Sequence, residues 1–292
     1  MKQHPALKGM KSTFIGIIVN ALLALLKAMT GIFGNSYALV ADAIESTADV
    51  FSSLIVWMGL KISSKPPDHD HPYGHGKAEP MAAVIVSLSL FIAAFVIVIQ
   101  SIRELILPHH TPASYTLVVL VFAIIVKEFL FRFLFRVGKD VGSIAVKTDA
   151  WHHRSDAFTS AAAFVGISIA LIGGPGYESA DTWAALVASG VILFNAIRLL
   201  KPAVGELMDA SPSPVLEKEI RTVALTVDGV ESLDKCTIRK VGFDFYVDLH
   251  VRVKGTMSVR RAHSISHTVK DTICSSNERI ANVLIHIEPG KN

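Results

Sequence analysis

The chain has 292 residues, 51% of them hydrophobic, and its mean hydropathy of +0.47 is too high for an ordinary soluble domain. The formal net charge of +3 at pH 7 is too small to indicate a nucleic acid as partner. We therefore expect an integral membrane protein. The two cysteines, Cys236 and Cys274, lack a paired metal-binding spacing and are expected to be reduced thiols.

Six apolar segments are candidates for membrane spans, which need about 20 residues each. They are 13–33, 38–60, 81–102, 115–135, 144–172 and 182–200. The first contains Asn20 and Lys27, so one side of this segment is expected to face the interior of a helix bundle. The fourth is interrupted by Lys127 and Glu128, and we expect its basic side chains to reach toward the membrane interface.

The distribution of lysine and arginine indicates the orientation of the spans. These residues gather in the N-terminal segment and in the loops after the second and fourth spans, whereas the other loops nearly lack them. Basic loops stay in the cytoplasm, so six spans place both termini there. The inner membrane of a bacterium is the expected location.

The character of the chain changes near residue 207. No apolar run beyond this point is long enough to span a membrane, which separates a membrane domain at 1–206 from a soluble domain at 207–292. The second domain is expected to contain helices at 214–226 and 259–274 and strands at 234–241, 244–254 and 282–288. This order predicts a cytoplasmic α+β domain with its helices on one face of the sheet.

Two of the apolar segments carry polar pairs at helical spacing. Glu45 and Asp49 are four residues apart in the second segment, so they share one face of a helix. His152 and Asp156 repeat this spacing in the fifth. Because an unpaired carboxylate is costly in hydrocarbon, the pairs must face the bundle interior, where together they would form a nitrogen and oxygen site for a divalent cation. The alternative is a polar seam that only fixes helix packing.

Other polar residues extend these features. Asp42 and Asp149 share the same helix faces one turn away, and we expect them to line a vestibule or to support the ligands. The loop after the second span groups Asp68, His71 and His75 within eight residues, which is metal-capable chemistry. The alternative for this loop is a solvated segment that binds metal only weakly.

A third set lies in the soluble domain. Its members are Asp248 and His250 on one strand, His263 on a helix, and His286 and Glu288 on another strand. Residues two apart on a strand lie on the same side of the sheet, so each strand pair has a common face. The alternative is that these are ordinary surface side chains.

With these motifs in view, the chain resembles the cation diffusion facilitators, a family of proton-coupled exporters of divalent metals. The matching residues are the pair Glu45-x-x-x-Asp49, the pair His152-x-x-x-Asp156 and the loop His71-Pro72-Tyr73-Gly74-His75-Gly76-Lys77. The match covers nearly the whole chain. It implies six spans with a ferredoxin-like cytoplasmic domain, a homodimer in the lipid membrane, and no cofactor other than the transported and bound metal.

The resemblance also implies the roles of single residues. Metal ligands are expected at Glu45, Asp49, His152 and Asp156 (transport site), Asp68, His71 and His75 (loop site), and Asp248, His250, His263, His286 and Glu288 (cytoplasmic site), with Asp234 as a further candidate. Lys77 and Asp209 are expected to form a salt bridge of the dimer. Since members with histidine in the fifth helix favour zinc or iron, these are the first expected metals, with Mn²⁺, Co²⁺, Ni²⁺ and Cd²⁺ as alternatives. Where this chain has Glu45, the family usually has His or Asp.

Two other functions would also use metal ligands within a membrane. An intramembrane metalloprotease would need His-Glu-x-x-His, which this sequence lacks. A membrane metal sensor or scaffold that transports nothing would use the same ligands, and it remains the alternative to proton-coupled metal efflux.

Overall fold

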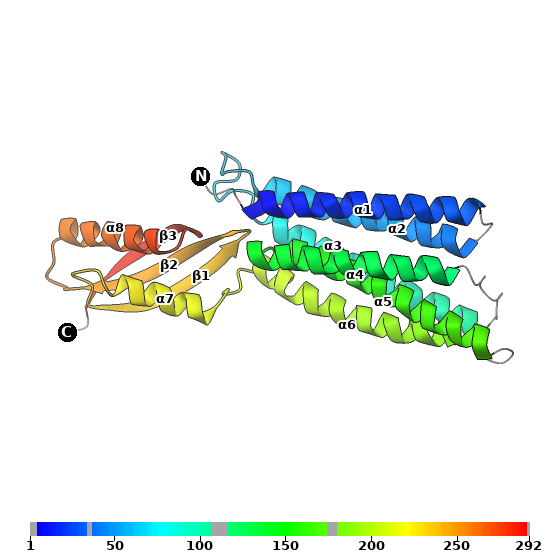
Figure 1. Ribbon diagram of the computed structural model, residues 1–292. Helices are drawn as coiled ribbons and strands as arrows, with labels where there is room; N and C mark the ends of the chain where they lie inside the picture. The colour runs from blue at the N-terminus through cyan, green and yellow to red at the C-terminus, as the bar shows by residue number, and fades with distance from the viewer. Residues whose placement is uncertain (1–4, 34–36, 107–115, 174–179, 291–292) are drawn as a thin grey trace. The chain divides into compact units, whose positions relative to one another are not determined.

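The computed structural model describes residues 5–33, 37–106, 116–173 and 180–290 (Figure 1). The chain divides into two compact units, residues 1–204 and residues 205–292. The first unit is built from helices, and the second contains a sheet with two helices.

Within the described residues, the first unit contains six long helices. They are α1 (Pro5–Phe33), α2 (Tyr37–Ser63), α3 (Ala78–Ile106), α4 (Thr116–Val141), α5 (Ile144–Gly173) and α6 (Ala180–Leu207), the last of which continues into the second unit. Each segment expected to span the membrane lies inside one of these helices, apart from residue 115, which is outside the described residues.

Three stretches of the described residues are long and apolar enough to cross a membrane. They are Pro5–Thr30, Ala78–Arg103 and Leu186–Leu207. Helices α2, α4 and α5 have 27, 26 and 30 residues, so each is roughly 40–45 Å long, but their charged residues lower their hydropathy. Length and composition thus support three spans, and the number six remains a prediction.

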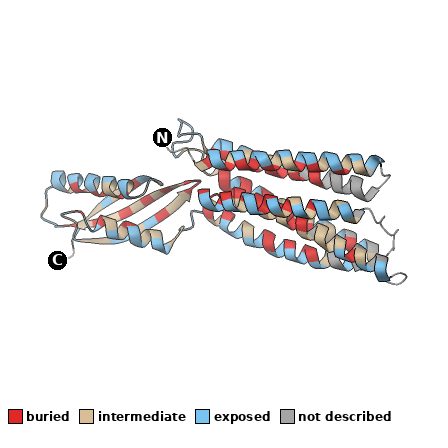
Figure 2. Cartoon of the chain, viewed as in Figure 1, coloured by how far each residue is buried: buried red, intermediate tan, exposed pale blue. Residues whose placement is uncertain are grey.

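Figure 2 shows buried residues on some faces of these helices and exposed residues on others; many of the exposed side chains are large and apolar, and several polar ones are buried. Phe95, Phe129 and Phe194 are exposed, whereas Asn20 and Lys27 of α1 are buried. This is the arrangement expected where lipid covers the outside of a bundle. The prediction that one side of the first helix faces the interior is confirmed.

Close packing brings α2 and α5 together. Helix α2 packs against α1, α3 and α5, and α5 also packs against α3 and α4. A Cβ atom added at Gly59 of α2 would lie 2.5 Å from Cβ of Ala82 on α3, so a glycine is required at this crossing. Because α2 packs against α5, the two helices that carry the paired polar residues are neighbours.

The second unit has the predicted element order. Its elements are α7 (Pro214–Ala224), β1 (Ser232–Val241), β2 (Asp244–Val253), α8 (Val259–Ser276) and β3 (Ile280–Pro289). The sheet order is β1-β2-β3, with β2 antiparallel to β1 and parallel to β3. Gly242, with φ of 64°, opens the two-residue turn between β1 and β2, where a left-handed residue is needed.

One face of this sheet is covered and the other is open. Helices α7 and α8 contact each other, and they contact β1 and β3 respectively, so both cover the same face. Buried and partly buried residues alternate along β2 (Figure 2). Because successive side chains of a strand point to opposite sides, buried Leu249 faces the helices and His250 and Arg252 face the open side. The α+β prediction is confirmed. Cys236 and Cys274 are unpaired thiols, as expected.

Candidate metal centres

Asp49 of α2 meets His152 and Asp156 of α5 inside the helical unit. Nε2 of His152 lies 3.0 Å from Oδ1 of Asp49, and ligand atoms of all three residues lie within 4.8 Å of one another. Asp49 is only 3% exposed and His152 only 7%. The structure thus brings together three of the four residues predicted for the transport site, while the side chains of Glu45 and of Asp42 lie outside the described residues.

A cavity of about 140 Å³ opens at this cluster. Its walls come from α2, α3, α5 and α6, and the lining residues are Asp49, Ser52, Ser89, Leu90, Ala93, Ile97, His152, Ser155, Asp156 and Ile192. A volume of this size accommodates a divalent ion together with a few water molecules. Imidazole and carboxylate groups in such a cavity are suitable ligands for that ion.

Lys127 of α4 is part of the same cluster, which sequence reasoning missed. Its Nζ donates to Oδ2 of Asp49 at 2.5 Å and to Oδ2 of Asp156 at 2.9 Å, and the residue is 2% exposed. The expectation that basic side chains of this segment reach the interface is wrong for Lys127, because two carboxylates in the bundle compensate its charge. A lysine in the middle of an apolar segment was the available signal.

A second buried polar group lies beside these residues. Ser53 donates to Oδ1 of Asp149 at 2.9 Å, and Nε2 of His153 lies 3.8 Å from the same oxygen. Nδ1 of His153 is 3.5 Å from the amide nitrogen of Asn20 and 4.0 Å from Oδ2 of Asp156. Sequence reasoning missed His153, although it follows Asp149 at the helical spacing of four, and it placed Asn20 in the bundle interior without a role at this group.

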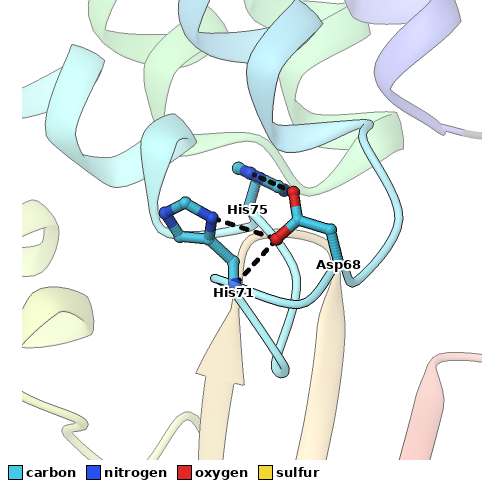
Figure 3. Close-up of side chains that lie close together, drawn as sticks. All are labelled: Asp68, His71 and His75. Carbon is cyan, nitrogen blue, oxygen red and sulfur yellow. Dashed lines mark hydrogen bonds and ion pairs between the residues drawn. The ribbon is translucent and has the colours of Figure 1, made fainter.

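The loop between α2 and α3 holds Asp68, His71 and His75 together (Figure 3). Oδ1 of Asp68 accepts from the backbone N–H of His71 at 2.7 Å, and Oδ2 lies 3.4 Å from Nε2 of His75. The N–H of His71 holds the pKa of the Asp68 carboxyl below its usual value. Gly74 has a φ of 77°, which lets the loop turn back between the two histidines.

On the open face of the sheet, the structure brings together His250, His286 and Glu288. Nδ1 of His250 lies 2.8 Å from Oε1 of Glu288, and this hydrogen bond lowers the pKa of the Glu288 carboxyl. The other oxygen, Oε2, is 3.3 Å from Arg252, whose guanidinium also binds Asp234 at 3.0 Å. Asp234 therefore contacts this cluster through an arginine that sequence reasoning missed.

Two further predicted ligands lie elsewhere in the single chain. His263 is on α8, on the covered side of the sheet, and its ring pairs with that of His267 at 4.6 Å between centroids. Asp248 shares the open face but is not among the three grouped ligands. Lys77 and Asp209 belong to different units, so their salt bridge stays a prediction.

A helix bundle with exposed apolar side chains, a buried cluster able to hold a cation and an attached α+β unit fit a membrane protein that handles cations. Residues 13–208 match the family model described as the cation efflux transmembrane domain. Residues 212–290 match that of the cytoplasmic domain of cation efflux proteins. The chain belongs to the cation diffusion facilitator family, whose members are transporters and not enzymes.

Three relatives illustrate the similarity. The manganese efflux system protein MneP of Bacillus subtilis is 32% identical over 283 residues, which are 96% of this chain and 95% of MneP. Metal tolerance protein 2 of Oryza sativa is 35% identical, covering 94% of this chain and 76% of the relative. Magnetosome protein MamB of Paramagnetospirillum magneticum is 31% identical, covering 91% and 90%.

Proposed function

We propose that this protein exports a divalent metal cation from the cytoplasm in exchange for protons, with zinc or iron as the first candidates. The convergence of Asp49, His152 and Asp156 from two helices on one buried cavity carries this proposal. Relatives named for manganese efflux and for metal tolerance support the direction of transport. Glu45, one helical turn before Asp49, is the proposed fourth ligand.

Competition at the ligands couples the two fluxes. His152 must be neutral to coordinate a metal, so a proton and a metal exclude each other at its ring. When the cavity faces the cytoplasm, metal displaces protons. When it faces the other side of the membrane, protons displace the metal, and the inward proton gradient drives this exchange.

The donor set supports zinc or iron. One imidazole nitrogen among carboxylate oxygens suits Zn²⁺ and Fe²⁺, whereas a site of oxygens alone would suit Mn²⁺ better. His152 is the residue that makes this difference, and it lies within hydrogen-bonding distance of Asp49.

We further propose six spans with both termini in the cytoplasm, in the inner membrane of a bacterium. The protein would work as a homodimer, with a salt bridge between Lys77 and Asp209 and a ferredoxin-like cytoplasmic domain. His250, His286 and Glu288 would bind cytoplasmic metal there, with His263, Asp248 and Asp234 as further candidates, and would shift the dimer population without carrying the flux. The loop site at Asp68, His71 and His75 would bind a further metal.

The test is a transport assay with the full-length protein in proteoliposomes that contain a metal-sensitive dye or a pH-sensitive dye. We expect an imposed pH gradient to drive Zn²⁺ or Fe²⁺ across the membrane while protons move the opposite way. Metal binding without any metal movement would overturn the proposal in favour of a metal sensor.

A further inference from the structure

Lys127 donates hydrogen bonds to oxygen atoms that would bind the metal in the proposed transport site. Its Nζ lies between Oδ2 of Asp49 and Oδ2 of Asp156, at 2.5 and 2.9 Å. The remaining oxygen of Asp49 is 3.0 Å from Nε2 of His152. The two carboxylates of the proposed site are thus bridged by an ammonium group that comes from a third helix, α4.

The ammonium and a metal ion cannot share these oxygens. Zn²⁺ binds a carboxylate oxygen at about 2.0–2.2 Å, and Nζ is within 3 Å of the same atoms of Asp49 and Asp156. A dication bound there would lie close to a monocation in a buried site, where charges interact strongly. One of the two cations must therefore leave.

The surroundings of Lys127 offer acceptors for a displaced ammonium. Oδ2 of Asp149 and Oδ1 of Asn20 are buried and have no hydrogen-bond partner among the residues that the structure describes. Asp149 is close to the proposed metal ligands, because the ring of His153 lies 3.8 Å from Asp149 and 4.0 Å from Asp156. The flexible four-carbon stem of a lysine allows its charged end to move by several ångströms.

We propose that Lys127 is a tethered competitor of the transported metal: it occupies Asp49 and Asp156 in the metal-free carrier and leaves them when the metal binds. This inference rests on the proposed function, since it takes the two aspartates as metal ligands. The competitor lowers the affinity for the metal and so favours its release. It also compensates both carboxylates while the empty carrier returns.

If Lys127 had only a structural role, its replacement would change the affinity for the metal in the opposite direction. If Lys127 only held α4 against α2 and α5, removing its charge would leave the ligands less well positioned and would weaken metal binding. If Lys127 competes with the metal, removing its charge strengthens binding. The direction of the change in affinity therefore separates the two roles.

The experiment measures Zn²⁺ binding to the detergent-solubilised full-length protein by calorimetry at one pH. The membrane site is defined as the binding that Asp49→Ala abolishes, which separates it from the cytoplasmic domain. We expect Lys127→Met to raise the affinity of this site at least about tenfold, a change that calorimetry resolves readily, whereas Lys127→Arg stays near the wild-type value. Lys8→Met removes a lysine charge from an exposed pair with Asp140 and should change nothing.

Unchanged or weaker binding in Lys127→Met, beside normal wild-type binding, overturns this inference alone. A wild-type protein without any binding that depends on Asp49 overturns the proposed function instead. If Lys127→Met does not fold, a second measurement tests the inference: a structure of the wild-type protein with Zn²⁺ bound at Asp49. There, Nζ of Lys127 should have left both carboxylates, and an ammonium still bonded to both beside the metal contradicts the proposal.

Discussion

The carboxylate of Glu79, at the start of α3, accepts a hydrogen bond of 2.6 Å from the hydroxyl of Ser143, which precedes α5. The same oxygen accepts from the backbone N–H of Ala145 at 2.7 Å, and Ser143 in turn accepts from the N–H of Val146. Two side chains thus cap the first turn of α5 with oxygen acceptors. Because α5 carries His152, Glu79 helps to set the position of this proposed metal ligand.

Replacing Glu79 by alanine should destabilise the protein, because it leaves the buried Ser143 hydroxyl and the N–H of Ala145 without an acceptor. We expect a loss of about 2 kcal/mol in the free energy of unfolding, measured by denaturation in detergent. Glu217→Ala, which removes an i,i+4 pair with Arg221 on α7, is the control and should cost about 0.5 kcal/mol or less. An equal cost for both variants would contradict the capping role.

Asp49→Ala and Asp156→Ala should each abolish metal transport while the protein still folds and dimerises. Each change removes a proposed metal ligand. It also removes one carboxylate of an ion pair that Lys127 of α4 makes with α2 or α5. Initial rates of metal uptake into proteoliposomes provide the measurement. Asp140→Ala, which breaks only the exposed pair with Lys8, should transport normally. Near-normal uptake by Asp49→Ala or Asp156→Ala would show that the transport site is not where we propose it.

Position 45 should influence the choice of metal. Glu45→Asp shortens the side chain by one methylene, about 1.5 Å, while Zn–O bonds of about 2.0–2.2 Å tolerate little stretching. We expect this variant to change the relative rates for Zn²⁺, Fe²⁺ and Cd²⁺ more than the overall activity. Glu45→His should favour Zn²⁺ over Mn²⁺, because it adds an imidazole. Unchanged selectivity in both variants would show that Glu45 is not a ligand.

The cluster on the open face of the sheet should account for metal binding by the cytoplasmic domain. Glu288→Ala removes both a carboxylate ligand and the acceptor for His250, so we expect at least about a tenfold loss of affinity at this site. Calorimetry on full-length protein with Asp49→Ala and His71→Ala isolates this binding from the proposed transport and loop sites. His267→Ala, on a helix that covers the other face of the sheet, is the matched control. Equal affinities in both variants would place the domain's metal elsewhere.

The Cys236 thiol should react slowly at neutral pH. Burial raises its pKa to about 11, whereas an exposed thiol in the unfolded chain titrates near 8.5. Between these values the folded protein keeps a proton that the unfolded chain loses, so the contribution of this thiol to stability falls as pH rises through that window. In a Cys274→Ser variant, alkylation should be slow at pH 8 and accelerate toward pH 11. Rapid labelling of folded protein at pH 8 would contradict this.

Much of the architecture follows from local patterns in the sequence. The alternation along residues 244–254 predicts one buried and one open face, because successive side chains of a strand point to opposite sides, and β2 has this pattern. In the same way, the spacing of four between His152 and Asp156 predicts a shared helix face, and the structure places both beside Asp49. Periodicity is a property of the chain itself, so such features need no knowledge of neighbouring elements.

The partners across elements were decided by the tertiary structure alone. The sequence presents Lys127 as an interruption of an apolar segment, and only the packing of α4 against α5 brings its ammonium to two carboxylates. The sequence likewise groups His263 with His250, whereas the helix that carries His263 covers the opposite face of the sheet. Spacing along a chain determines which side chains share a face. The charge that compensates a buried ion depends on which faces then pack together, and that pairing is a long-range property of the fold.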